Sequence, residues 1–105
     1  MSKRSRRKAL QNIASSVGNA AAHIALYEDF PFTMKEAISY FSQAAEIVGE
    51  RTWNEAEIKH LSDLSTKRAA RVIRARLEPG RKKEFDNLFD RAKEEITRFI
   101  EAEIL

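Results

Sequence analysis

Apolar residues recur every three or four positions along nearly the whole chain, which is the spacing that places them on one side of an α-helix. The first such stretch covers about residues 6–27. Its apolar side is formed by Leu10, Ile13, Ala14, Val17, Ala20, Ala21 and Ile24. Because Pro31 disfavours helical backbone at the residue before it, we expect the first helix to end before Phe30.

The next two helices are each predicted to begin at a capping box, in which a Thr side chain and a Glu three residues later bond to each other's backbone. Thr33 and Glu36 form the predicted box of the second helix. Thr52 and Glu55 form the predicted box of the third. These signals divide the middle of the chain into two helices.

The third apolar pattern is long and imperfect. It continues to Leu77 before Pro79 ends it. On a straight helix, however, Leu64 would fall outside the apolar side and Arg76 would fall on it. We therefore expect a bend or a break near Ser65.

A fourth pattern covers about residues 81–104 and has a clean apolar stripe. The stripe consists of Phe85, Leu88, Phe89, Ala92, Ile96, Phe99 and Ile100. Short connections between long amphipathic helices are typical of antiparallel bundles. The predicted fold is all-α, an antiparallel helical bundle of four helices, or of five if the third helix breaks.

Composition sets the domain organisation and the compartment. A chain of 105 residues with three Gly and two Pro fits one domain with few turns. We expect residues 1–8 to be a flexible basic tail and residues 9–105 to be a single helical-bundle domain. The lack of Cys excludes disulfides and thiolate sites and favours a cytoplasmic location. Residues 9–27 are too polar for a membrane span, so no membrane partner is expected.

Residues 9–27 carry no acidic side chain and no Lys or Arg. A solvated helix face normally carries charges, so this helix is expected to be covered, either by the rest of the bundle or by a second chain. Four small residues on it would let another helix approach closely: Ala14, Gly18, Ala21 and Ala25. They are the candidate interface of a homo-oligomer, and a central helix within a monomer is the alternative.

Lys and Arg gather in two blocks, one at the N-terminus and one between residues 67 and 83. In the second block, Lys67, Arg71 and Arg74 fall within about 60° of one another on a helix, with Arg68 beside them. Clustered basic side chains attract phosphate backbones through counterion release. The candidate residues for binding RNA, DNA or another polyanion are Lys67, Arg68, Arg71, Arg74, Arg81, Lys82 and Lys83.

Two further interpretations of this block remain open. Seven acidic and three basic residues follow Lys83, so the fourth helix could pair with the basic face, within the chain or across an oligomer interface. The protein would then be an interaction or scaffold module with no nucleic-acid role. Ile58, Leu64 and Ala69 also have the apolar spacing of a helix-turn-helix, which requires a real break near Ser65.

The sequence offers no catalytic constellation. Glu57 and His60 form one Glu-x-x-His pair, but a di-metal bundle needs two, and the only other histidine, His23, has no Glu three residues before it. There is no Gly-x-Ser-x-Gly and no Gly-rich loop. We therefore expect no enzyme activity, no metal, no cofactor and no small-molecule substrate. The predicted function is that of a small non-enzymatic binding protein.

Overall fold

The computed structural model describes residues 3–27 and 34–105, and over these residues the chain is almost entirely helical. The elements are α1 (Lys3–Tyr27), α2 (Met34–Val48), α3 (Glu55–Arg76), the 3₁₀-helix η2 (Pro79–Glu84) and α4 (Phe85–Glu103). Within these ranges the helices pack against one another and no strand occurs, which confirms the predicted all-α bundle. No helix in the described part of the chain combines the length and the apolar character needed to cross a membrane.

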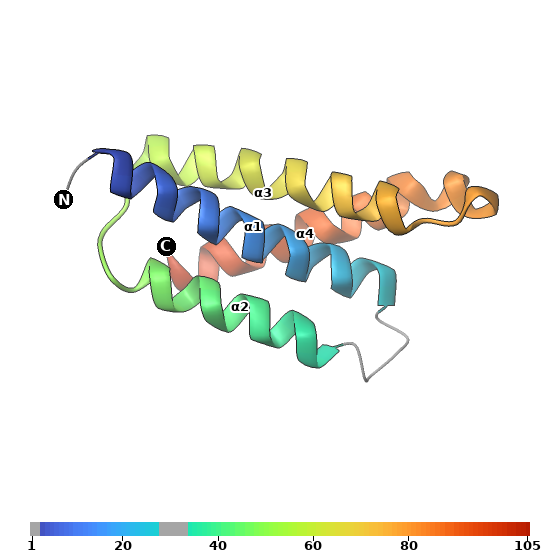
Figure 1. Ribbon diagram of the computed structural model, residues 1–105, viewed down its shortest axis with the longest axis horizontal. Coiled ribbons are helices and arrows are strands. Elements are labelled where there is room, and N and C mark those ends of the chain that lie inside the picture. The colour runs from blue at the N-terminus through green and yellow to red at the C-terminus, as the bar shows by residue number, and fades with distance from the viewer. Residues whose placement is uncertain (1–2, 28–33) are drawn as a thin grey trace.

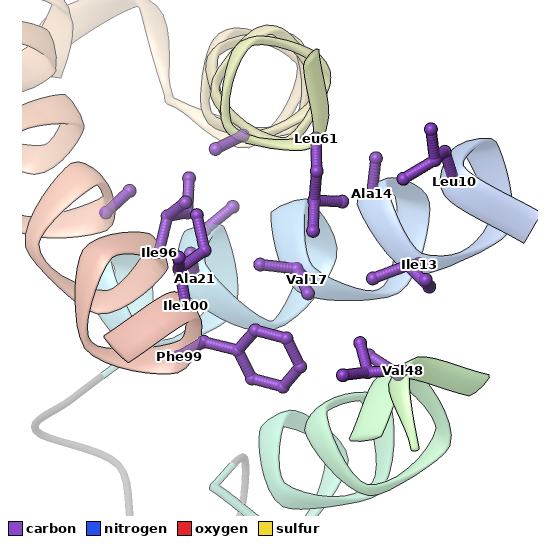
Figure 2. Close-up of a cluster of buried hydrophobic side chains, with 14 of the residues drawn as sticks. Leu10, Ile13, Ala14, Val17, Ala21, Val48, Leu61, Ile96, Phe99 and Ile100 are labelled. Carbon is purple, nitrogen blue, oxygen red and sulfur yellow. The ribbon is translucent and has the colours of Figure 1, made fainter. Parts of the chain in front are cut away.

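Helix α1 lies at the centre of the bundle (Figure 1). Helices α2, α3 and α4 all pack against it, whereas α2 and α3 make no close contact with each other over the described residues. The core forms where the apolar sides meet, with Val17 of α1, Leu61 of α3 and Phe99 of α4 among its members (Figure 2). Val48 closes the core from α2.

The central position of α1 explains why its residues 9–27 carry no Lys, Arg, Asp or Glu. Ala14, Gly18, Ala21 and Ala25 are all buried within the single chain, under α1's own neighbours. The structure therefore gives these four residues contacts within the chain, and the prediction that they bind a second chain stays untested. The alternative prediction, a central helix within the monomer, describes what these residues do.

Helix α3 is continuous from Glu55 to Arg76, so the predicted break near Ser65 is wrong, and with it the five-helix bundle and the helix-turn-helix. The reason is a close crossing of α1 and α3. Ser65 is completely buried at that crossing, where its carbonyl faces Gly18. The misfit of the apolar pattern is accommodated without a break, because Leu64 is only half-buried and Arg76 lies exposed in the last turn.

Of the two predicted capping boxes, the structure describes the start of α3 only. Helix α3 does begin with a box, but it is formed by Asn54 and Glu57, two residues later than predicted from Thr52. The Glu57 N–H donates to Asn54 Oδ1 at 2.8 Å, and the Asn54 N–H donates to Glu57 Oε1 at 3.1 Å. The predicted box at Thr33 lies outside the described residues. The turn before α4 is the 3₁₀-helix η2, so α4 starts at Phe85 rather than near residue 81.

Helix α1 begins at Lys3, inside the segment 1–8 that we expected to be a tail. Arg6 ties its first turns to the start of α3. Its guanidinium donates to both carboxylate oxygens of Glu57, at 2.9 and 2.8 Å, and to the Thr52 carbonyl at 2.8 Å. It also lies over the Trp53 ring, 5.2 Å from the centroid. The first basic block is thus partly engaged within the fold.

Candidate polyanion-binding face

The predicted basic face lies on the second half of α3. Lys67, Arg71 and Arg74 are exposed there, on the side turned away from the buried Ala69 and Ile73. They lie within eight residues of helix, and the seven rises between the first and the last amount to about 10 Å along the helix axis. We call these three residues the α3 ridge. Their placement on one face follows from helical periodicity alone and agrees with the sequence analysis.

No residue of the α3 ridge forms an ion pair with any other part of the chain that the structure describes. Three acidic residues of α4, Asp90, Glu94 and Glu95, pair with basic residues of α4 itself. Glu95 accepts from Arg91 at 2.7 Å and from Arg98 at 3.1 Å. Asp90 pairs with Lys93 at 3.2 Å. The pairing of basic and acidic helices within the chain, which was the rival prediction, is therefore not seen among the described side chains.

Arg68 behaves differently from the three ridge residues. Its Nε donates to Asn19 Oδ1 of α1 at 3.0 Å, and the side chain is half-buried. Its Cβ and Cγ lie directly above Gly18, which has no side chain to push them away. Arg68 therefore belongs to the α1–α3 contact and to the groove beside it, and only flanks the α3 ridge.

A shallow groove between α3 and α4 borders the ridge on one side. It has a volume of about 710 Å³, and Lys67, Arg71, Arg74 and Phe89 are among its lining residues. The Arg74 guanidinium stacks on Phe85 at the start of α4, 4.7 Å from the ring centroid. This cation–π contact holds the guanidinium against an apolar surface while leaving its N–H donors available. The groove thus combines basic side chains with one exposed edge of aromatic surface.

The remaining predicted residues lie at the end of the molecule where α3 turns back into α4 (Figure 1). Arg81 pairs with Glu84, and their hydrogen bond raises the pKa of Arg81 and lowers the pKa of Glu84. Lys82 and Lys83 are exposed and form no ion pair with the described residues. Of the seven predicted residues, five are therefore exposed without a carboxylate partner in the described chain, and two are engaged.

A second groove, which we did not predict, lies between α2 and α3 with α1 as its floor. Asn19 and His23 line it from α1, Glu36 and Tyr40 from α2, and Arg68, Arg71, Val72, Ala75 and Arg76 from α3. We call it the α1 groove. The sequence held one signal for it, the uncharged polar positions of α1, but which helices flank that face depends on the packing.

Of the Glu-x-x-His pair, Glu57 takes part in folding contacts. Glu57 binds Arg6, and the hydrogen bond from Arg6 together with the Asn54 N–H lowers its pKa. His60 is exposed in the following turn. Across residues 3–27 and 34–105, no three His, Asp or Glu side chains come together as metal ligands would.

Comparison of the chain with protein-family models, curated proteins and solved structures found no match. The function must therefore be argued from the geometry of the face and its grooves.

Proposed function

We propose that this chain is a small, non-enzymatic binding protein that holds a nucleic acid, or another polyanion, on the α3 ridge. The observation that carries the proposal is that Lys67, Arg71 and Arg74 stay exposed and without ion pairs over the described chain. Asp90 and Glu95, two of the acids that follow them in the sequence, pair with basic residues of α4 instead. A basic face that the fold leaves uncompensated is available to an external anion.

The dimensions of the α3 ridge support a phosphate backbone as the anion. Phosphates on one strand follow at about 3.4 Å along a DNA axis, so a ridge about 10 Å long matches three of them. Lys82 and Lys83 extend the positive surface beyond the end of α3. Backbone contacts of this kind position a protein on nucleic acid without reading its sequence, so we propose binding with little sequence preference.

The compartment and assembly state belong to the same proposal. A chain without Cys suits the reducing cytoplasm, where we place it. A homo-oligomer stays a prediction, although the four small residues of α1 are buried within the chain. Light scattering over a concentration series distinguishes a monomer from an oligomer.

The test compares the double variant Arg71→Glu/Arg74→Glu with the wild-type chain by fluorescence anisotropy, using labelled single-stranded RNA and duplex DNA. Wild-type binding should weaken with salt. For three to five phosphate contacts, the slope of log K against log [salt] should be about −2.7 to −4.5 on duplex DNA and about −2 to −3.5 on single-stranded RNA. The double variant should abolish binding while its helical circular dichroism stays unchanged. Absence of binding by the wild-type chain at low salt contradicts the proposal.

The matched control is Lys35→Glu/Lys59→Glu, which changes the net charge equally at exposed positions on α2 and the first half of α3. It should retain most of the binding, because those residues lie outside the ridge. Equal losses in the two variants would mean that net charge alone, and not the ridge, attracts the polyanion. If the ridge variant instead lowers the thermal stability or dissociates an oligomer, the result supports the alternative function. The protein would then be an interaction module whose basic and acidic residues pair with each other.

A further inference from the structure

The α1 groove has properties that the α3 ridge lacks. It is more enclosed than the groove between α3 and α4, its volume is about 330 Å³, and its surface is mainly polar. That volume is at the lower end of the range for small-molecule sites, which is about 300–1,000 Å³. A space of this size and polarity suits one small polar molecule, whereas a nucleic-acid strand needs an open surface.

The charges in the α1 groove are unbalanced. Arg68, Arg71 and Arg76 line one wall, and Glu36 is the one carboxylate among the lining residues. The guanidiniums therefore exceed the carboxylate by two positive charges. Arginine binds phosphate through parallel N–H donors, and a dianionic phosphomonoester matches the surplus.

Two of the donors in the α1 groove are already held in place. Arg68 is fixed by the bond from its Nε to Asn19 Oδ1 at 3.0 Å, which leaves its other guanidinium donors for a ligand. His23 is nine-tenths buried. Its side chain is 9% exposed, its Nε2 lies 3.0 Å from Glu36 Oε2, and the centroid of its ring lies 4.9 Å from that of the Tyr27 ring. Groups that are ordered before binding cost less conformational entropy when a ligand arrives.

The side of the groove opposite the arginines adds selectivity. The Glu36 carboxylate is 67% exposed and repels an anion, but it accepts a hydrogen bond from a hydroxyl or amino group. Tyr40 of α2 lines the same wall. A ligand therefore has to place its phosphate against α3 and a hydrogen-bond donor against α2.

We propose that the α1 groove binds a small phosphomonoester that also carries hydroxyl or amino donors, such as a nucleoside monophosphate or a sugar phosphate. The site goes beyond the polyanion proposal and does not depend on it, although Arg71 borders both. Of the two grooves, Arg76 and Tyr40 line the α1 groove alone, and Lys67 lines the groove between α3 and α4 alone. These three residues therefore separate the two sites.

The test is a titration of the full chain with adenosine monophosphate, glucose 6-phosphate, inorganic phosphate and adenosine. Calorimetry and amide NMR detect the binding. At least one of the two phosphomonoesters should bind saturably and shift the amide signals of Asn19, His23 and Tyr40. Inorganic phosphate should bind more weakly, and adenosine should not bind. The ester that binds tells a nucleotide ligand from a sugar phosphate.

Arg76→Ala should weaken the binding of that ester by about tenfold, the effect of losing one charge-assisted contact. Tyr40→Phe keeps the ring and should weaken it a few-fold. Lys67→Ala removes the same charge from the same helix outside the groove and should leave the affinity unchanged. All three positions are at least partly exposed, so the variants should keep the wild-type helical content.

Three results would overturn the inference. They are the absence of saturable binding of both phosphomonoesters at millimolar concentration, equal losses in Arg76→Ala and Lys67→Ala, and equal affinity for inorganic phosphate. The assay with the ridge double variant measures nucleic-acid binding, and the titration measures phosphomonoester binding. Failure of one proposal therefore does not decide the other.

Discussion

The sharpest prediction concerns Gly18, where α1 and α3 approach most tightly. A methyl group added there would lie 2.6 Å from Arg68 Cβ and 2.8 Å from the Ser65 carbonyl oxygen. Both atoms belong to the backbone of α3 or are bonded directly to it. They cannot rotate away as the end of a long side chain would. The Gly18→Ala substitution must therefore move one helix relative to the other.

The size of the effect follows from two opposing terms. Ordinary van der Waals contact begins near 3.4 Å, so α3 must retreat by about 0.6–0.8 Å. A separation of that size forfeits about a quarter to a half of each affected contact energy, and overpacking of this kind costs about 1–3 kcal/mol. Replacing Gly by Ala inside a helix returns up to about 1 kcal/mol through helix propensity. We expect a net loss of about 1–2 kcal/mol.

Thermal unfolding followed by circular dichroism measures this loss. For a domain of this size it corresponds to a Tm lower by about 4–16 °C. Gly80→Ala is the matched control, because an added Cβ there meets nothing within 4 Å and the backbone is not left-handed. The stability of Gly80→Ala should stay the same or increase by up to about 1 kcal/mol, so its Tm should not fall. An unchanged or raised Tm in Gly18→Ala would refute the close crossing of α1 and α3.

Three further substitutions test the contacts around α3. Ser65→Ala should raise the stability by up to about 1 kcal/mol in chemical denaturation, because the Ser65 hydroxyl is buried without a hydrogen-bond partner in the described structure; a loss of stability would show that the hydroxyl does have a partner. Asn54→Ala removes the cap of α3 and should cost about 1 kcal/mol, and an unchanged Tm would contradict the box. Glu57→Gln should lower the Tm at pH 7, because Arg6 loses its charged partner. The lowered pKa of Glu57 means that its stabilisation is complete above the unfolded value of about 4.3 and is lost as the pH falls through the folded pKa. The Tm gap between wild type and Glu57→Gln should therefore shrink below about pH 4, and a gap independent of pH would contradict the Arg6 pairing.

Much of the fold could be predicted from the sequence because helix formation and one-sided burial are local properties. The spacing of residues such as Ile13 and Val17 identified the buried side of α1, and both are fully buried. The same periodicity placed Lys67, Arg71 and Arg74 on one exposed face, since residues on one helix keep their angular relation whatever packs against it. The candidate ridge needed no tertiary information.

The contacts between helices could not be predicted in this way. Which side chains meet across two helices depends on how each helix is rotated about its axis and where the two cross, and a periodic pattern fixes neither. Packing placed Ser65 at the crossing with Gly18. The helix α3 therefore runs uninterrupted through this small buried polar residue, where the apolar pattern suggested a break. Packing also directed Arg68 to Asn19, away from the ridge.

The uncharged part of α1, residues 9–27, shows most clearly what the sequence determined and what the packing decided. Its composition predicted that another helix covers it, because a helix face without charges is poorly suited to full solvation. Whether the cover came from the same chain or from another required the arrangement of the other three helices, and in the structure it comes from the same chain. The same arrangement keeps α2 and α3 apart above α1, and so creates a polar groove whose lining residues are distant in the sequence.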